Sequence, residues 1–189
     1  MKKKSIIIIA VIAVAVILIG SVIGSYNGLV ESREGVEQSQ SEISNQLQRR
    51  ADLIPNFVAT VKGYSDYEQE TYTAVTQARA AVTGADTVTE QAEASAQLDS
   101  AIDIWVNAVT EAYPELKANE QYIALQTELS GTENRIAQAR RDYNESAKEF
   151  NVEIKKFPRS IIAGIFGIDS YDYFEATDGT ESVPEVSFD

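Results

Sequence analysis

The sequence predicts an all-α protein: an N-terminal transmembrane helix, then an antiparallel up-and-down four-helix bundle, then an acidic, extended C-terminal tail. Three observations support this prediction. Residues 5–25 form an apolar run without charge or proline. Apolar residues recur at helical spacing between residues 26 and 168, and no alternating strand pattern occurs there. Residues 169–189 contain seven acidic residues and no basic one, so we expect this tail to be extended or disordered.

The apolar run is long enough to cross a bilayer, because ~20 residues at ~1.5 Å rise span the ~30 Å hydrocarbon core. The alternative is a cleaved signal peptide, since Val22-Ile23-Gly24 before Ser25 is a tolerable cleavage site. Signal peptides usually carry only about 7–15 apolar residues, which favours an anchor. The lysines in residues 1–4 favour a cytoplasmic N-terminus, with everything after the span outside the cytoplasm. The opposite topology is the alternative.

Four helices are predicted after the anchor. The first runs to Gly63 and contains Pro55 as a kink or break. The second begins at the capping box of Ser65 and Glu68 and ends at about Thr83, before Gly84. The first helix presents one apolar stripe, made of Leu29, Val36, Ile43, Leu47, Ile54, Val58 and Val61.

The third helix begins at a second capping box, Thr87 with Glu90, and ends at about Ala112. The fourth covers residues 119–157 and ends before Pro158. Helix lengths of about 50, 27, 37 and 58 Å bring the end of the fourth helix back towards the membrane. Its near-heptad stripe is suited to a bundle: Tyr122, Leu125, Leu129, Thr132, Ile136, Ala139, Tyr143, Ala147, Phe150, Ile154 and Phe157.

Two apolar features are candidates for self-association at the level of the membrane. Gly20 and Gly24 form a G-x-x-x-G pattern, which lets two membrane helices approach closely, although glycine is also frequent in such helices. Residues 159–168 are too short to span a membrane and unusually apolar for a linker, so they either lie in the interface or cover the base of the bundle. The candidate residues are Gly20, Gly24, Ile161, Ile162, Ile165 and Phe166.

The composition excludes several classes of function. The chain has 16 basic and 29 acidic residues, and without Lys2–Lys4 its net charge is −16, which argues against nucleic acid and anionic lipid headgroups as partners, since both need a basic face. Cysteine and histidine are absent, so thiolate nucleophiles, Ser-His-Asp hydrolysis and histidine-based metal sites are excluded. We therefore expect no catalytic residues, no metal site and no cofactor, and we predict that the protein is not an enzyme.

Arg50 is the most unusual residue, because it falls between Leu47 and Ile54 on an apolar stripe. A buried guanidinium needs a partner, and Asp52 lies on a different helix face. We therefore expect a partner from another helix, such as Glu133 or Asp142, and a structural ion pair more than a ligand-binding arginine.

Four tyrosines fall at the two turns that the helix lengths place farthest from the membrane: Tyr64, Tyr67, Tyr113 and Tyr122. They form either a partner-binding tip or a plug in the open end of the bundle.

Several sequence motifs resemble the LemA family over nearly the whole chain. They are Tyr26-Asn27-x-Leu29-Val30, Gln46-Leu-x-Arg-Arg-x-Asp-Leu-Ile-Pro-Asn-x-Val58, Val61-Lys-Gly-Tyr64, Ala78-Arg79-Ala80, Tyr113-Pro-x-Leu-Lys-Ala118, Glu133-Asn-x-Ile-Ala-x-Ala-Arg140, Tyr143-Asn144, Asn151-x-x-Ile154 and Phe157-Pro158. The resemblance implies a single-pass anchored protein with a four-helix bundle and no agreed biochemical activity. Within these motifs, candidate structural or interaction residues are Arg50, Asp52, Pro55, Asn56, Tyr64, Tyr113, Tyr143, Asn144 and Asn151.

The predicted domains are residues 1–4 (cytoplasmic), 5–25 (transmembrane), 26–168 (bundle) and 169–189 (tail). The predicted function is that of a membrane-tethered binding, scaffold or self-assembling accessory protein of the bacterial cell envelope. Its expected partners are the lipid bilayer and a second copy or another membrane protein. The alternative is a ligand-sensing ectodomain that works through a membrane partner.

Overall fold

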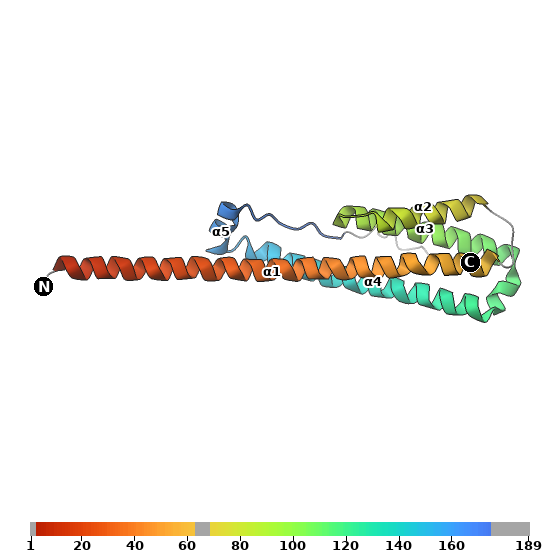
Figure 1. The fold of residues 1–189 in the computed structure, drawn as a ribbon, viewed down its shortest axis with the longest axis horizontal. Helices are drawn as coiled ribbons and strands as arrows, with labels where there is room; N and C mark the ends of the chain where they lie inside the picture. Colours follow the sequence, from red (N-terminus) through yellow and green to blue (C-terminus); the bar gives the residue numbers. More distant parts are fainter. Residues whose placement is uncertain (1–2, 63–68, 175–189) are drawn as a thin grey trace, which may run out of the picture. The chain divides into compact units, whose positions relative to one another are not determined.

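A computed structural model describes residues 3–62 and 69–174, and within them the protein is all-α (Figure 1). This part of the chain holds five α-helices and one 3₁₀ helix, and no strand. The chain divides into two compact units. The first unit consists of Met1–Ser39 and Tyr143–Asp172, and the second of Gln40–Asp142 and Tyr173–Asp189.

Helix α1, Lys3–Lys62, is a single helix of 60 residues that contains both the apolar run and the first predicted helix of the soluble part (Figure 1). Pro55 lies inside it, so of the two predicted alternatives, a kink or a break, the break does not occur. By length and composition, α1 is the one helix among the described residues that is able to cross a membrane. The most apolar stretch of α1 has no buried residue, and Ile17, for example, is 70% exposed. The apolar run therefore has no protein partner in the described chain.

The end of the second predicted helix and both ends of the third agree with the predicted boundaries. Helix α2 spans Gln69–Thr83 and α3 spans Val88–Ala112. Thr87 caps α3: its side chain accepts from the Glu90 amide at 3.2 Å, and the Glu90 carboxylate accepts from the Thr87 amide at 3.0 Å, which confirms the second capping box. The first capping box, Ser65 with Glu68, lies outside the described residues.

A short 3₁₀ helix, η1, Pro114–Ala118, connects α3 to α4, Glu120–Glu153. Helix α4 ends before the predicted position. Phe157 therefore leaves the buried stripe and is 81% exposed, which corrects its place in the predicted core. A helix that periodicity did not predict, α5, Arg159–Phe166, begins directly after Pro158.

Helix α5 has a well-formed C-terminus at Gly167, which adopts a left-handed conformation with φ 63° and ψ 42°. The amide groups of Gly167 and Ile168 both donate to the carbonyl of Ala163, the latter at 2.9 Å. This is the arrangement by which glycine ends a helix, since residues with a side chain avoid this conformation.

Both predicted stripes are buried, apart from Phe157 and the half-buried Leu125. In the first unit, the core combines the following residues of α1, α4 and α5: Leu29, Val36, Tyr143, Ala147, Phe150, Ile154, Ile162 and Ala163. In the second unit, α2 packs along α3 (Figure 1). There, Phe57 of α1 contacts Trp105 of α3 edge-on, with ring centroids 5.3 Å apart, and Tyr122 of α4 at 5.2 Å.

The start of the predicted tail is packed and not disordered. In the first unit, Tyr171 contacts Phe150 with ring centroids 5.3 Å apart. In the second unit, Phe174 is buried, and the guanidinium of Arg140 lies over its ring at 5.5 Å. These aromatic residues hold residues 169–174 although the segment is acidic. Residues 175–189 lie outside the described part.

Candidate functional site

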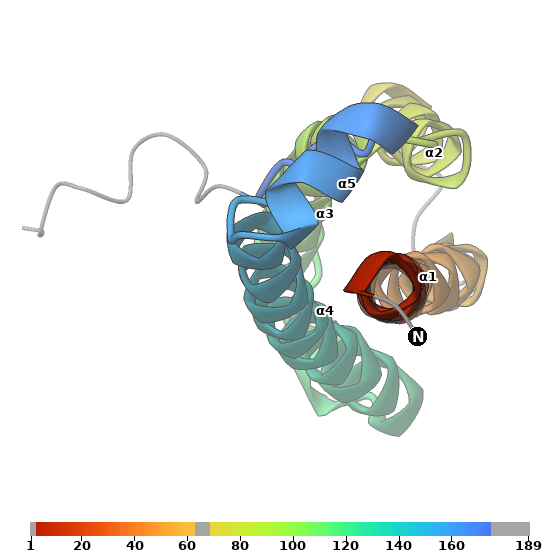
Figure 2. The same ribbon diagram turned by 90° about the vertical axis from the view of Figure 1, so that its left-hand side faces the viewer.

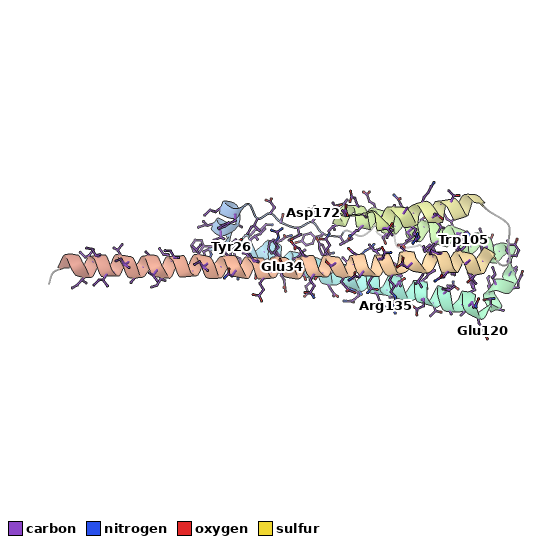
Figure 3. The ribbon with its side chains drawn as sticks, viewed as in Figure 1. Tyr26, Glu34, Trp105, Glu120, Arg135 and Asp172 are labelled. Carbon is purple, nitrogen blue, oxygen red and sulfur yellow. The ribbon has the colours of Figure 1, made fainter. Side chains whose placement is uncertain are left out.

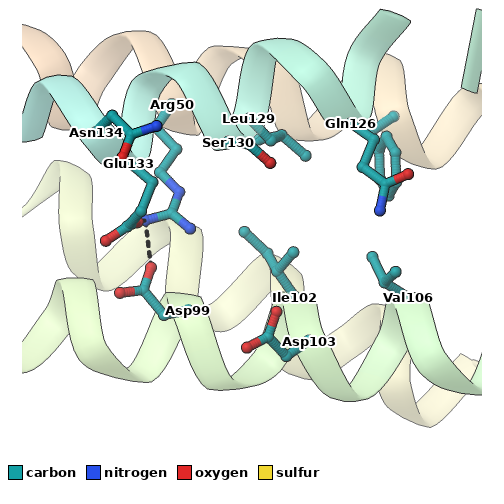
Figure 4. A pocket seen from close by; sticks show the side chains of 11 residues that line it. Arg50, Asp99, Ile102, Asp103, Val106, Gln126, Leu129, Ser130, Glu133 and Asn134 are labelled. Carbon is teal, nitrogen blue, oxygen red and sulfur yellow. Dashed lines mark hydrogen bonds and ion pairs between the residues drawn. The ribbon is translucent and has the colours of Figure 1, made fainter. Parts of the chain in front are cut away.

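Four charged side chains, which we call the charge cluster, meet inside the second unit: Arg50, Asp99, Glu133 and Arg140. Arg50 of α1 forms ion pairs with Asp99 of α3 and Glu133 of α4 (Figure 4). The Arg50 residue is only 6% exposed, whereas the side chains of Asp99 and Glu133 are 32% and 44% exposed. One buried cation therefore links three helices.

The position of Arg50 in α1 explains its burial. It stands in a heptad row in which Ile43 and Phe57, seven residues before and after it, are both buried. A charge there is tolerated only when it is paired. Glu133 is one of the two expected partners. Asp99 was not expected, because nothing in the sequence distinguishes it from the solvated acids of α3.

The charge cluster contains two cations and two anions, and burial and the opposite charges shift the pKa values of Asp99 and Arg140 in opposing directions. Burial raises the pKa of the Asp99 carboxyl, and the Arg50 cation opposes this rise. Burial lowers the pKa of Arg140, while the nearby Asp99 and Glu133 carboxylates raise it. Among the described residues, the buried Nε and Nη2 atoms of Arg140 have no hydrogen-bond partner. Two cations and two anions thus share one partly buried site.

Arg79 of α2 donates a hydrogen bond to the backbone of α1 near Pro55. Proline lacks an amide hydrogen, so Pro55 leaves the carbonyl of Ala51, four residues earlier, without its usual donor. The Arg79 Nε donates to this Ala51 oxygen at 2.7 Å. Its Nη2 also lies 3.8 Å from the Asp52 carboxylate. The arginine of α2 therefore replaces the missing helix hydrogen bond, which accounts for an uninterrupted α1.

A cavity of about 490 Å³ opens beside the charge cluster (Figure 4). Its polar end holds Arg50, Asp99 and Glu133, with Asp103 nearby, and its apolar wall includes Phe57, Ile102 and Leu129. A second hollow, of about 570 Å³, lies between small residues of α2 and α3. No group of three or more histidine, cysteine, aspartate or glutamate residues in the described chain is suited to a metal ion.

The other candidates in the second unit lie apart from this cavity. Asp52 is exposed and accepts from Gln48 at 2.8 Å, and Asn56 is exposed on the same helix. Tyr113 is half-buried at the C-terminal end of α3. Tyr64 lies outside the described residues. Tyr122 is buried against Phe57, so it is not part of an exposed tip.

In the first unit, two candidates hold the chain after α5. The Tyr143 hydroxyl donates to the carbonyl of Asp172 at 2.9 Å, and burial raises the pKa of Tyr143 to about 12. The Asn151 side chain donates to the Tyr171 carbonyl and accepts from its amide, both at 2.8 Å. Asn144 is half-buried on α4. Tyr143 and Asn151 therefore fasten residues 171–172 to α4, a role that the sequence motifs did not reveal.

The self-association candidates separate into different environments. Ile162 is only 4% exposed in the core of the first unit, so it is not available for association, which corrects that prediction. Ile161, Ile165 and Phe166 are 55%, 72% and 55% exposed. Gly20 and Gly24 have no neighbouring atoms where a side chain would be added.

A model of the LemA family matches residues 39–188, which include the charge cluster, α4 and α5. This chain belongs to the LemA family. Protein LemA of Metamycoplasma hominis is 29% identical over 157 residues, which make up 82% of this chain and 71% of that relative. The family resemblance in the sequence motifs is thereby confirmed.

This LemA-family chain is also similar, over shorter segments, to magnetosome proteins. Magnetosome protein MamQ 2 of Paramagnetospirillum magneticum is 40% identical over 68 residues, or 36% of this chain and 25% of that relative. Magnetosome protein MamQ of Magnetospirillum gryphiswaldense is 37% identical over 67 residues, or 35% of this chain and 25% of that relative. These matches cover only a quarter of each magnetosome protein.

Proposed function

We propose that this LemA-family protein is a membrane-tethered accessory protein that acts by binding or self-assembly. The observation that carries this proposal is the exposure of the apolar run of α1. A run of this length without any protein cover is stable when lipid surrounds it. Because the same helix continues into the packed core, the anchor and the soluble part are one element.

The soluble part forms, in this proposal, an antiparallel up-and-down four-helix bundle outside the cytoplasm. Within the second unit, support comes from the ion pairs that join α1, α3 and α4 and from the packing of α2 on α3. Support for the orientation comes from the lysines at residues 2–4.

Catalysis forms no part of the proposal. The chain lacks histidine and cysteine, and the partly exposed carboxylates of the charge cluster are paired with Arg50. A paired, charge-balanced cluster stabilises structure more readily than it transfers protons.

Labelling of single cysteines tests the anchor and its orientation, since the native chain has no cysteine. Glu145 is exposed on α4, so E145C is expected to react with a membrane-impermeant maleimide on intact cells. K3C is expected to react only after the cells are permeabilised. The reverse pattern would refute the orientation, and release of the chain from membranes by alkaline carbonate would refute the anchor.

Disulfide crosslinking tests self-association through the G-x-x-x-G pattern. G24C in the native membrane is expected to give a crosslinked dimer, because a glycine interface brings two helices into close contact. I23C is the matched control, because the neighbouring residue points about 100° away on the helix. Equal crosslinking of both variants would count against a specific glycine interface. Crosslinks to another membrane protein alone would replace the second copy with that partner.

A second candidate function is ligand sensing, and the cavity beside the charge cluster favours it. Asp99, Asp103 and Glu133 outnumber the single cation Arg50 at the polar end of the cavity, and Phe57 and Leu129 give it an apolar wall. Such a site suits a small organic cation with an apolar part. Phenethylamine is expected to raise the melting temperature of the native chain more than that of D103N. An equal effect on both proteins would remove this candidate.

A further inference from the structure

Helix α5 carries an apolar face that no described residue covers. Ile161 and Ile165, four residues apart on one side of the helix, are 55% and 72% exposed, and Phe157 just before the helix is 81% exposed. The opposite side is packed, because Ile162 and Ala163 are 4% and 5% exposed. The helix is therefore fixed to the first unit by one face and leaves an equally apolar face open.

The contacts of α5 place it directly beside the end of the apolar run. The ring of Phe166 contacts that of Tyr26, with centroids 4.7 Å apart. Tyr26 comes three residues after Ile23, so at ~1.5 Å per residue it lies about 5 Å beyond the last large apolar residue of the run. Figure 3 shows Tyr26 on α1 next to α5. Tyrosine is enriched at this level of membrane helices.

Helix α5 also lies across α1 and not along it. Its first residue, Arg159, has its Nη2 atom only 2.9 Å from where a Gly28 side chain would begin, while its last residue contacts Tyr26. Side chains from both ends of α5, a helix that is ~12 Å long, thus contact positions only two residues apart on α1. Figure 2 looks along α1 and shows α5 lengthwise, as expected for a crossing helix. If α1 crosses the bilayer, α5 lies roughly in the membrane plane.

Basic residues surround the start of α5 in an otherwise acidic chain. Lys155 and Lys156 are exposed in the turn that leads to it. Arg159 forms an ion pair with Glu153, so only the two lysines are available to a phosphate group. Anionic headgroups attract such lysines at a membrane surface.

From this geometry we propose that α5 is an interfacial membrane helix, whose face of Phe157, Ile161 and Ile165 enters the bilayer beside the anchor while Lys155 and Lys156 contact lipid headgroups. The proposal rests on the proposed insertion of α1. It adds a second point of attachment, so that the first unit is held to the membrane at both α1 and α5.

A bilayer fits this surface better than a second copy of the chain does. A stable protein interface buries about 800 Å² on each partner, far more than Phe157 and two side chains of the eight-residue helix α5 provide. A second α5 would also bring identical lysines together. An interfacial helix needs only an apolar face that reaches about 5–10 Å into the headgroup and acyl boundary.

Fluorescent labelling of single cysteines tests the proposal in the full chain. The variants I165C, V16C and I104C are labelled with an environment-sensitive dye and reconstituted in phosphatidylcholine–phosphatidylglycerol vesicles. Val16 lies in the apolar run, and Ile104 of α3 is 59% exposed, a close match for Ile161 and Ile165. The dye at position 165 is expected to lose roughly half of its fluorescence to brominated lipids, because it contacts acyl chains. The dye at position 104 is expected to be quenched by aqueous iodide instead.

The outcomes distinguish failure of the proposed interfacial helix α5 from failure of the proposed membrane anchor. Quenching by brominated lipid at position 16 but not at position 165 would overturn the interfacial role of α5 and leave the anchor intact. No such quenching at position 16 would refute the anchor itself. Equal lipid quenching at positions 104 and 165 would show that contact is not specific to α5. Nanodiscs with one chain each exclude a second copy: loss of the 165 signal there would assign the face to self-association and overturn the proposal.

Discussion

Replacement of Arg50 by methionine tests the structural role of the charge cluster. R50M keeps a long side chain in the buried position but removes the cation between Asp99 and Glu133. Loss of one partner from a buried ion pair usually costs about 3–5 kcal/mol. Because the two carboxylate side chains are 32% and 44% exposed, water recovers part of that cost, and we expect about 2–3 kcal/mol. For a chain of this size, this lowers the melting temperature by about 5–10 °C.

The effect of R50M is expected to depend on pH. Burial already raises the folded-state pKa of Asp99 above its ordinary value of 3.8, and Arg50 opposes this rise. Without Arg50 the folded-state pKa rises further. A carboxyl with a raised folded-state pKa favours the folded state below 3.8, and this contribution is lost as pH rises through the folded-state pKa. The destabilisation should therefore be larger near neutral pH than in acid.

Thermal unfolding of the full chain in a mild detergent, followed by circular dichroism at 222 nm, measures this effect. R49M is the matched control: the neighbouring Arg49 side chain is 54% exposed and lies 3.3 Å from Glu128, so its loss should cost less than about 1 kcal/mol. The quadruple variant R50M/D99N/E133Q/R140M should regain most of the lost stability, because all four charges of the charge cluster are removed together. An R50M melting temperature equal to that of R49M would refute the structural role.

Three further predictions use the same assay or a simple extension of it. F57A should cost about 3–5 kcal/mol and shift the emission of the single tryptophan, Trp105, because it removes a buried ring that packs against both Trp105 and Tyr122; unchanged emission would contradict this packing. Burial raises the folded-state pKa of Tyr143 to about 12 from its ordinary value of 10.0. Its contribution to stability is therefore present below pH 10 and is lost as the pH rises through about 12, and Y143F should reduce this alkaline loss in a pH series. N151A removes both hydrogen bonds to Tyr171, so proteases should cleave at residues 169–174 much faster than in the native chain, whereas equal rates would show that Asn151 does not hold this segment.

The sequence predicted the long helices well, because their signals are long and repeated. The buried stripes of α1 and α4 recur over several heptads, and a capping box marks the start of α3. Pro55 predicts a kink or a break, and the break does not occur, because the compensating donor, Arg79, comes from another helix. A missing hydrogen bond is visible in the sequence, whereas its replacement depends on packing.

The shorter features were missed for physical reasons. Helix α5 has eight residues, too few for a periodic pattern, and its end at Gly167 is set by one glycine in a left-handed conformation. The net charge of residues 169–189 predicts an extended or disordered tail, but the aromatic contacts of Tyr171 and Phe174 pack its first residues against the helices. The Glu133 partner of Arg50 was predicted, whereas Asp99 becomes recognisable only when α3 is placed beside α1.

The charge cluster also explains how a row of similar apolar residues keeps one register in the second unit. A slip of α1 by one heptad would place Ile43 or Phe57 where Arg50 now lies, so an apolar side chain would still fill that position. The slip would, however, bury the guanidinium among apolar side chains and leave Asp99 and Glu133 without their cation. Only the shifted registers carry this cost in free energy. The ion pairs can therefore favour the native register even if they stabilise the protein no more than apolar residues at the same positions would. The uncharged quadruple variant is therefore expected to recover stability while it loses the feature that distinguishes one register from the next.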